Sequence, residues 1–518
     1  MVTADTVVFE GPVNLTDRQA VAELRAVLDR HGYTATGVTD ALGAALPFNK
    51  SHLRDDLPLY LRRLTVPTPI NTLVKLFVLD RWVDQADAAA ALAPLDLDRV
   101  RAMGLLEDGP SGVRARLRLS VHEGLLIAHD AYDEETRTLR TDHVLDVNPT
   151  TISLSHLTVR RPVQRALEIG TGCGVLALKA SRHAEQVVAT DTNPRALNLA
   201  VFNAALNGIT NVEWRLGSLF EAVAGERFDL IFSNPPYVIS PDSQFIFRDG
   251  GRRGDALCEE IIRRAPAHLR DGGYATVLIN WAIRSNEEWS APLRRWVDGN
   301  GCDSWLMLSA AEDPTTYAAM WTRSRDRATY SAGLERWIRY FDELGLHAIG
   351  LGAVVMRRNT SGTPWVRADQ LPESVTAAAS AHLERLFDAE DRLASLTDDA
   401  VLFAQRFETV RDHQLTQTLK FQGPTYTIAS AEVRLQGGLP FNGTVDAHTT
   451  QLLARCDGRR TLAEIAAEIA ATSDLDPDKC TSACATIARR LIGMGFLVPP
   501  SVTPAIGSSP GRQEGSVQ

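Results

Sequence analysis

A polar tetrapeptide after an apolar stretch carries the residue types from which the chemistry of this chain can be inferred. Leu230-Ile231-Phe232 is followed, after one serine, by Asn234-Pro235-Pro236-Tyr237. The Asn234 side-chain oxygen and the Pro235 carbonyl can each accept one N–H of a planar amino group, which orients the nitrogen lone pair and stabilises developing positive charge. The prolines fix φ, and Tyr237 offers a flat ring for stacking. The segment therefore indicates either a site that activates a planar nitrogen or a proline-stiffened loop with an asparagine turn.

A glycine-rich segment and an aspartate indicate a nucleotide-like ligand. Gly170, Gly172 and Gly174 alternate strictly after the apolar stretch 166–169, whereas a dinucleotide turn has its third glycine one residue later. The turn therefore suits a ligand without a diphosphate. Asp191 ends a second apolar stretch, 17 residues after Gly174. A carboxylate at that place can accept both hydroxyl hydrogens of a ribose. A glycine turn alone indicates no more than a tight strand-to-helix connection.

Together these features resemble the class I S-adenosylmethionine (AdoMet) methyltransferases, over roughly residues 150–358. Asp271-Gly272-Gly273, downstream of the tetrapeptide, is similar to the HemK-like branch. That branch includes the glutamine methyltransferases of peptide-release factors and enzymes that methylate guanine or adenine amines. The resemblance implies a Rossmann-like, doubly wound α/β sheet of seven strands, AdoMet as the cofactor, and no metal. It implies an enzyme that transfers a methyl group (EC 2.1.1.-).

The resemblance also assigns the site residues. Asn234, Pro235 and Tyr237 are expected to be catalytic. The residues expected to bind the cofactor are Glu168, Gly170, Thr171, Gly172, Gly174, Asp191, Thr192, Ser218, Leu219 and Asn234. Relatives commonly have an acid where Ser218 stands, so a hydroxyl or backbone carbonyls must contact the adenine amine here. Residues 150–154 could lie beside the cofactor, with a loop as the default structure.

The loop 240–254 is expected to form a lid over the acceptor. Its Arg248, Arg252 and Arg253 either meet an acidic partner or phosphates, or are ordinary solvated charges. Downstream, an insertion before the last strand contains several aromatic residues, which we expect to pack a core rather than to stack bases. These residues are Tyr317, Trp321, Tyr330, Trp337 and Tyr340.

Composition limits the class of protein. The 518 residues are too many for one core, and the formal net charge of −10 argues against wrapping nucleic acid electrostatically. The six cysteines form no disulfide framework. Cys480 and Cys484 lie one helical turn apart but lack a second ligand pair, so we expect buried thiols rather than a metal site. No signal sequence and no apolar stretch of membrane-spanning length is present, so we expect a cytoplasmic protein without membrane contact.

Flanking domains are expected on both sides of the methyltransferase domain, which we place at 146–360. Residues 1–145 read as mainly helical with a short hairpin, a pattern typical of a winged helix. Arg114, Arg116 and Arg118 either bind nucleic acid or a partner, or form the solvated face of a strand. Residues 361–500 have helical patterns that resemble small winged-helix domains of the peptide-chaperone type, with Thr461 as a helix cap, and we interpret them as a binding or dimerisation module. The tail 501–518 is expected to be disordered.

The resulting hypothesis is an AdoMet-dependent N-methyltransferase whose acceptor is a protein glutamine or an exocyclic amine of a nucleic acid. Net acidity favours a protein or a small acceptor, and the two winged-helix candidates favour nucleic acid. The alternatives are a small-molecule methyltransferase of a biosynthetic pathway and a regulatory protein that binds AdoMet without turnover. The sequence leaves the acceptor, the pathway and the oligomeric state open.

Overall fold

The computed structural model describes residues 9–43, 56–131, 139–324, 326–360, 362–371, 375, 378–439, 441–472 and 476–500. The chain divides into two compact units, residues 1–374 and 375–518. The tail 501–518, for which disorder was predicted, lies outside the described residues. None of the helices in the described ranges is long and apolar enough to cross a membrane.

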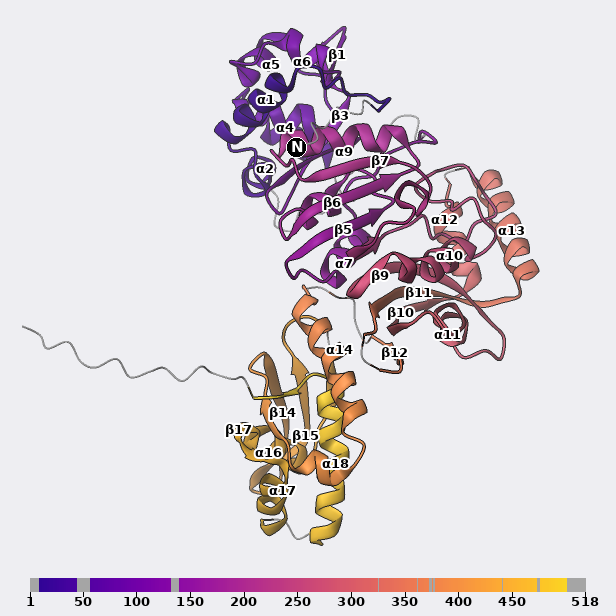
Figure 1. The fold of residues 1–518 in the computed structure, drawn as a ribbon. Helices are drawn as coiled ribbons and strands as arrows, with labels where there is room; N and C mark the ends of the chain where they lie inside the picture. The colour runs from indigo at the N-terminus through magenta and orange to yellow at the C-terminus, as the bar shows by residue number, and fades with distance from the viewer. Residues whose placement is uncertain are drawn as a thin grey trace, which may run out of the picture. The chain divides into compact units, whose positions relative to one another are not determined.

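The first unit is built on an eight-stranded sheet with the order β12-β10-β11-β9-β8-β5-β6-β7 (Figure 1). The strands β7, β6, β5, β8 and β9 are parallel neighbours, and β11 runs antiparallel to β9 and β10. Their bounds are β5 Val163–Ile169, β6 Ala184–Asp191, β7 Val212–Leu216, β8 Phe228–Ser233, β9 Leu269–Arg284, β10 Cys302–Glu312, β11 Leu346–Arg358 and β12 Val366–Gln370. A mostly parallel, doubly wound α/β sheet was predicted and is confirmed.

The predicted strand count of seven is wrong by one. The chain beyond Pro364 adds β12, which pairs in parallel with residues Ser304–Leu308 of β10. Without this strand the outer edge of β10 would present unpaired backbone groups, so a short covering strand removes an exposed edge. The five residues of β12 are half-buried or exposed in the pattern of an edge strand, and no long apolar stretch marks them in the sequence.

Helices cover the sheet and pack against its buried strand residues. Ile261 and Ile262 of α10 and Leu293 and Trp296 of α11 pack against buried residues of β5, β8, β9, β10 and β11. The bounds are α7 Pro149–Leu157, α8 Val175–Ala180, α9 Pro194–Leu206, α10 Ala256–Arg264, α11 Ala291–Val297, α12 Pro314–Thr322 and α13 Arg327–Leu344, with short 3₁₀ turns at Glu221–Val223 and Ala265–His268.

The aromatic insertion forms a smaller core of its own. Tyr317, Trp337 and Phe341 of α12 and α13 are buried together against Ile349 of β11. The prediction that Tyr317 and Trp337 pack a core is confirmed, and Trp321 and Tyr340 lie partly buried against the same cluster.

Helices and two antiparallel strand pairs make up the described part of the N-terminal segment. The bounds are α1 Arg18–Arg30, α2 Ala35–Leu42, α3 Leu57–Arg63, α4 Pro69–Phe77, α5 Gln85–Leu92, α6 Leu97–Ala102, β1 Leu106–Gly109, β2 Gly112–Ala115, β3 Leu117–His122 and β4 Leu125–Asp130. The alternating stretch 113–121 thus belongs to two consecutive strands, β2 and β3, with Arg116 between them. Arg114 is ion-paired with Glu107 and lies over the Trp82 ring at 4.9 Å. The winged-helix assignment stays a prediction.

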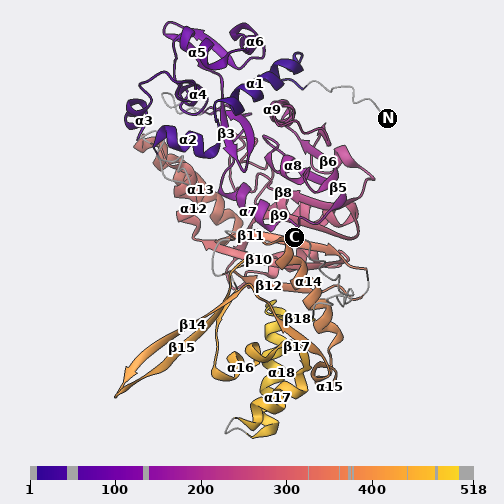
Figure 2. The same ribbon diagram turned by 90° about the vertical axis from the view of Figure 1, so that its left-hand side faces the viewer.

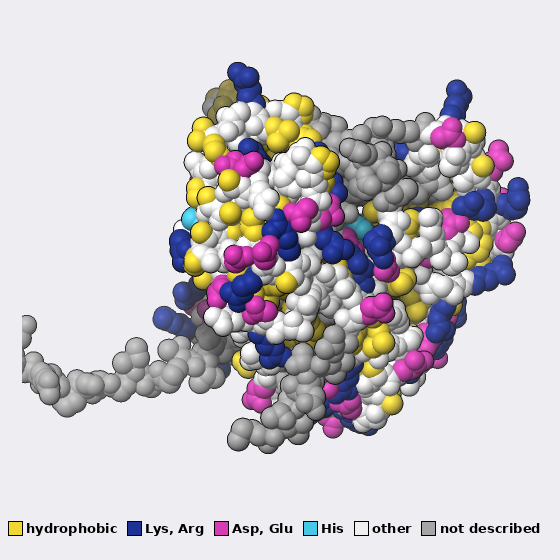
Figure 3. Space-filling view, turned by 90° about the horizontal axis from the view of Figure 1, so that it is seen from above, with side chains coloured by type: hydrophobic (Ala, Val, Ile, Leu, Met, Phe, Trp, Pro, Cys, Tyr) yellow, Lys and Arg dark blue, Asp and Glu magenta, His cyan; other side chains and the backbone are white. Residues whose placement is uncertain are grey.

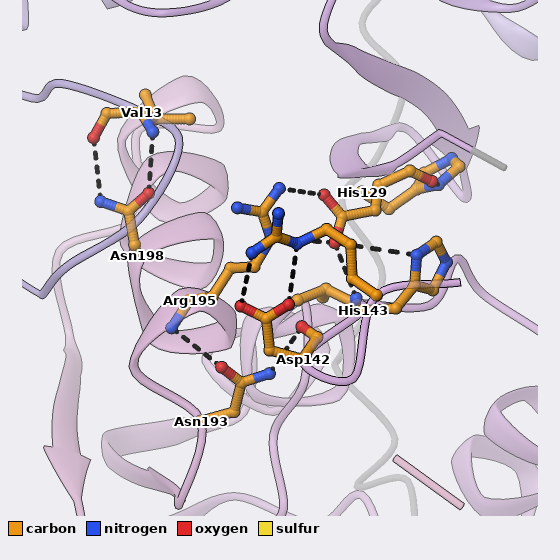
Figure 4. Close-up of polar contacts among 10 residues, drawn as sticks. Val13, His129, Asp142, His143, Asn193, Arg195 and Asn198 are labelled. Carbon is orange, nitrogen blue, oxygen red and sulfur yellow. Dashed lines mark hydrogen bonds and ion pairs between the residues drawn. The ribbon is translucent and has the colours of Figure 1, made fainter. Parts of the chain in front are cut away.

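Asparagines on α9 hold the N-terminal segment against the sheet domain. Asn198 accepts from the Val13 amide at 3.0 Å and donates to the Val13 carbonyl at 2.9 Å, as Figure 4 shows. Asn203 and Asn207 make the same paired contacts with the backbone of β4. Arg195 on the first turn of the helix is ion-paired with Asp130. Because each amide satisfies both a donor and an acceptor of the backbone, these contacts fix the docking of the segment.

The second unit combines helices with two three-stranded sheets, ordered β17-β13-β18 and β14-β15-β16. The bounds are α14 Ser380–Ser395, α15 Asp399–Phe403, β13 Arg406–Thr409, β14 His413–Gln422, β15 Thr425–Leu435, β16 Asn442–Thr444, α16 Ala447–Arg455, β17 Asp457–Thr461, α17 Leu462–Ala471, α18 Pro477–Gly493 and β18 Leu497–Val498. Thr461 caps α17, as predicted, in a reciprocal capping box with Glu464.

Candidate active site

A cavity of about 790 Å³ opens at the carboxyl ends of β5, β6 and β8. This is the edge at which open α/β sheets bind ligands. Every residue predicted for the site lines the cavity except Gly174: Glu168, Gly170, Thr171, Gly172, Asp191, Thr192, Ser218, Leu219, Asn234, Pro235 and Tyr237. The sheet topology therefore brings together segments that are up to 69 residues apart in the predicted set, from Glu168 to Tyr237.

The glycines of the turn after β5 have different roles. Gly170 and Gly172 have φ of +74° and +54°, and a Cβ at either would have no neighbour within 4 Å. They give the turn its shape and leave room at the cavity. A Cβ at Gly174 would lie 2.9 Å from the Ala200 Cβ and 3.0 Å from the Trp214 ring. Gly174 thus permits α8 to pack closely on α9, and does not line the cavity.

Asp191 is held by backbone amides where β6 ends. Its carboxylate accepts from Gly172 N at 2.8 Å and from Asn193 N at 2.9 Å. Desolvation by the surrounding protein raises the pKa of Asp191, and these amide hydrogen bonds oppose that shift. A fixed carboxylate with remaining lone pairs at the cavity is a suitable acceptor for vicinal hydroxyls.

Glu168 is a second buried carboxyl group of the cavity. It is 2% exposed, and its carboxylate accepts from Thr171 Oγ1 at 2.6 Å. Burial raises the pKa of Glu168 to about 8, with the Thr171 hydrogen bond opposing the shift. At neutral pH this side chain is therefore mostly protonated in the ligand-free protein, and a cation bound beside it would favour the carboxylate.

The Asn234 amide is oriented by a chain of hydrogen bonds. Its Nδ2 donates to Thr150 Oγ1 at 3.3 Å, and the Thr150 hydroxyl donates to Asn148 Oδ1 at 2.8 Å. Asn234 Oδ1 is buried and has no hydrogen-bond partner among the described residues. A buried acceptor without a partner carries a free-energy cost that a donor from a bound molecule would remove.

Thr150 belongs to a helix, and the default expectation of a loop at 150–154 is wrong. Residues Pro149–Leu157 form α7, in which Asn148 caps the first turn through its side chain and Pro149 occupies the first position. A proline at that position has no amide to leave unpaired, which favours the helix start. Thr150 and Thr151 line the cavity, so the placement beside the ligand site agrees with the prediction even though the conformation does not.

The segment after Tyr237 covers one side of the cavity. Phe245, Phe247 and Gly250 line it. Arg248 is ion-paired with Asp249 and lies over the Trp337 ring, while Arg252 is ion-paired with Glu260. Both cations thus have partners within the chain. Tyr237 is enclosed nearby, and burial raises the pKa of its hydroxyl group.

Several lining residues were not predicted. His143 precedes the sheet, Asn280 lies on β9, and Tyr317 and Trp321 come from α12. Asn280 Nδ2 donates to the Tyr317 hydroxyl at 2.9 Å. No sequence motif surrounds these residues. The one available signal was Asn280 inside a long apolar strand, because a buried amide needs a hydrogen-bond partner. The described residues contain no group of three or more His, Cys, Asp or Glu side chains that could hold a metal ion, and all six cysteines are buried.

Comparison with known proteins finds a family match for the residues that form most of this cavity. Residues 142–295 match the family model of the methyltransferase small domain. This part of the chain is therefore related to that family. Residues 30–116 and 384–499 match two further families, each described as a domain of unknown function.

The similar curated proteins confirm the resemblance to the HemK-like branch. The release factor glutamine methyltransferase of Xylella fastidiosa is 40% identical over 131 residues, which cover 23% of this chain and 47% of that protein. The protein of the same name from Cereibacter sphaeroides is 39% identical over 148 residues, covering 26% and 52%. The chain thus spans about half the length of the curated relatives it matches.

Among solved structures, a ribosomal protein L11 methylase from Lactobacillus delbrueckii subsp. bulgaricus aligns with 19% identity and a TM-score of 0.25, over 42% of this chain and 82% of that one. The fold assignment above depends on the strand pairing of this chain.

Proposed function

We propose that this chain transfers a methyl group from AdoMet to the side-chain amide nitrogen of a protein glutamine. The observation that carries the proposal is the unpartnered, buried Asn234 Oδ1 at the cavity. An acceptor oxygen whose amide is already oriented by Thr150 is suited to receive one N–H of a planar amino group. The names of the curated relatives support glutamine as the acceptor.

The cavity residues fit AdoMet. Asp191 provides a fixed carboxylate for ribose hydroxyls, and the open space over Gly170 and Gly172 admits a ligand close to the backbone. Glu168, buried beside Thr171, suits a cationic amino group, because a positive charge would lower its raised pKa. Ser218 would contact the adenine edge in place of the acid of relatives. The bound cofactor would supply an electrophilic methyl group on a sulfonium sulfur.

The proposed catalytic roles follow from the oxygen atoms that would contact the glutamine amide. Asn234 Oδ1 and the Pro235 carbonyl would each accept one N–H of the glutamine amide, which turns the nitrogen lone pair toward the methyl carbon. The same two oxygens would stabilise the positive charge that develops on nitrogen as the N–C bond forms and the C–S bond breaks. The sulfur would leave as a neutral thioether, and the nitrogen would release its proton to water to give a neutral N-methyl amide. Tyr237 would stack on the planar amide and limit its orientations.

Charge placement favours a protein acceptor over nucleic acid. Arg248 and Arg252 beside the cavity are ion-paired within the chain. On the face seen in Figure 3, basic and acidic side chains are interspersed. Nucleic-acid binding usually depends on a surface of one sign that releases counterions from phosphates.

The test of this proposal uses methyl-tritiated AdoMet, the purified chain and a cell lysate that is divided afterwards between protease and nuclease. Label lost to protease and recovered as N-methylglutamine after digestion supports the proposal. Label lost to nuclease would identify a nucleic-acid amine, and label that survives both would identify a small molecule. No label, with AdoMet bound, would identify a protein that binds AdoMet without turnover.

A further inference from the structure

The second unit contains a long hairpin that the proposed activity does not use. β14 and β15 pair antiparallel over residues 413–435, turn at Gly423-Pro424, and project from their unit in Figure 2. The third strand, β16, pairs only with residues Glu432–Arg434. Beyond this base, the hairpin is a two-stranded ribbon. Isolated two-stranded ribbons are marginally stable in water.

One face of the ribbon carries apolar side chains at its base and again toward its tip, with Gln417 between them. At the base this face is buried, with Ala431, Val433 and Leu435 between 2% and 7% exposed. Toward the tip the same face emerges into solvent. There it carries Leu419, Phe421, Tyr426 and Ile428, which are between 55% and 66% exposed.

The strand register places these four side chains together. Leu419 is opposite Ile428 and Phe421 is opposite Tyr426, and a bulge between Thr418 and Leu419 keeps the face continuous with Ala431 and Val433. The Phe421 and Tyr426 rings lie 5.3 Å apart. Leu415, at 37% exposed, continues the row toward the base. We call this set the apolar hairpin face: Leu415, Leu419, Phe421, Tyr426 and Ile428. A contiguous apolar patch of this kind marks an interaction surface.

Charge limits the kind of partner. The only charged residue between Leu415 and Ala431 is Lys420, which lies opposite Thr427 on the other face. An anionic membrane surface or a nucleic acid would require several basic residues here. The apolar hairpin face is neutral in a chain with a formal net charge of −10. Two copies can therefore approach through this face without like charges meeting across it.

We propose that the apolar hairpin face is the contact between two copies of this chain, packed face to face about a two-fold axis. Its four most exposed side chains and Leu415 would bury on the order of 500 Å² per copy. Two copies would together bury on the order of 1,000 Å², which reaches the lower range of specific interfaces. A symmetric contact needs only one self-complementary surface. The dimer would cover the ribbon that is otherwise exposed to water.

The first test places one cysteine on each side of the ribbon in the full chain. Gln417 lies on the apolar side and Thr418 on the opposite side, and both are exposed, while the six native cysteines are buried. A bis-maleimide that spans about 10 Å, the distance between two packed sheets, should cross-link Gln417→Cys into a covalent dimer. Thr418→Cys should cross-link at least about tenfold less at the same concentration. No cross-linking of Gln417→Cys, or equal cross-linking of both, would overturn the proposal.

The second test measures self-association by sedimentation equilibrium between roughly 1 and 100 µM. The unaltered chain should form a reversible dimer of twice its 56.6 kDa mass. Phe421→Ser with Tyr426→Ser should raise the dissociation constant at least about tenfold, because central aromatic contacts dominate such interfaces. Leu59→Ser, which removes an exposed leucine (46%) from α3, should leave it unchanged. A monomer throughout, or a hairpin variant that dimerises as well as the unaltered chain, contradicts the proposal. Methylation assays on both variants report separately on the proposed function.

Discussion

Asn234 is the residue at which the chemistry of this chain can be tested most directly. Its Nδ2 is occupied by Thr150, and its Oδ1 faces no partner in the part of the chain that the structure describes. Because the Thr150 hydroxyl donates onward to Asn148, it can only accept from Asn234, which fixes the two ends of the amide. The geometry thus prepares one acceptor atom before a substrate arrives, which is the property expected of a preorganised catalytic group.

We expect Asn234→Ala to retain AdoMet binding and to lose turnover by about 100-fold or more, the usual effect of removing one preorganised polar contact. Single-turnover methylation and equilibrium binding of AdoMet measure the two quantities separately. Asn211→Ala is the control, since the Asn211 amide bonds to backbone carbonyls around residues 181–185 and does not line the cavity. Full turnover by Asn234→Ala would refute the proposed role of this residue.

Glu168 gives a prediction about pH. Burial raises its pKa in the folded chain to about 8, above the ordinary glutamate value of 4.5. The folded state therefore binds this proton more tightly than the unfolded state does. Its stabilising contribution is complete below about pH 4.5 and is lost as the pH rises toward 8.

We accordingly expect Glu168→Gln, which is neutral at every pH, to show a smaller fall in Tm between pH 5 and pH 8 than the unaltered chain, by on the order of 5 °C. Thermal unfolding without AdoMet across this pH range measures the difference. Glu221→Gln, at an exposed carboxyl group, serves as the matched control. Parallel Tm profiles for Glu168→Gln and the unaltered chain would show that the buried carboxyl group does not titrate in this way.

At the level of elements, the glycine turn after β5 serves both the cavity and the packing of two helices. Gly170 and Gly172 leave space at the cavity, whereas Gly174 leaves space between α8 and α9. The alternation of the three glycines in the sequence does not separate these roles, because what a side chain would meet at each position depends on α9 and β7, which come later in the chain.

We expect Gly174→Ala to lower the free energy of unfolding more than Gly225→Ala does. Both glycines have similar positive φ, +84° and +78°, so both substitutions incur the same backbone strain. Only at Gly174 would the new Cβ also collide with Ala200 and Trp214, whereas Gly225 has no neighbour within 4 Å. Overpacking of this kind costs about 1–3 kcal/mol. Equal losses for the two variants, measured by chemical denaturation, would show that α8 and α9 separate without cost.

The parts of the fold that the sequence predicted are those determined by local pattern. The buried strands β5, β6 and β8 and the cap of α17 by Thr461 each depend on periodicity, turn chemistry or capping within a few residues. The sequence did not reveal β12, because an edge strand has no apolar stretch, and it did not reveal α7, whose small polar residues give weak periodicity. The sequence also did not predict that Tyr317 and Trp321 line the cavity, because α12 reaches the cavity only through tertiary packing.

At the scale of the whole molecule, the chain consists of two units with separate cores. The sheet core and the aromatic cluster of α12 and α13 belong to residues 1–374, whereas Leu383, Leu386 and Phe387 of α14 are buried within residues 375–518. The cavity lies entirely in the first unit. Ligand binding should therefore stabilise one unit, since a ligand stabilises only the cooperative unit that binds it.

We expect calorimetry to resolve two unfolding transitions, of which saturating AdoMet raises only one. At a concentration 100 times its dissociation constant, the ligand adds about 2.7 kcal/mol to the unit that binds it. Thr461→Ala should lower only the other transition, because it removes the hydroxyl that accepts from the Glu464 amide in the capping box on α17, a loss of about 1 kcal/mol. Thr329→Ala is the matched control, since Thr329 lies on α13 in the first unit. If AdoMet raised both transitions equally, or if Thr461→Ala lowered the one that AdoMet raises, the two units would unfold as one cooperative body.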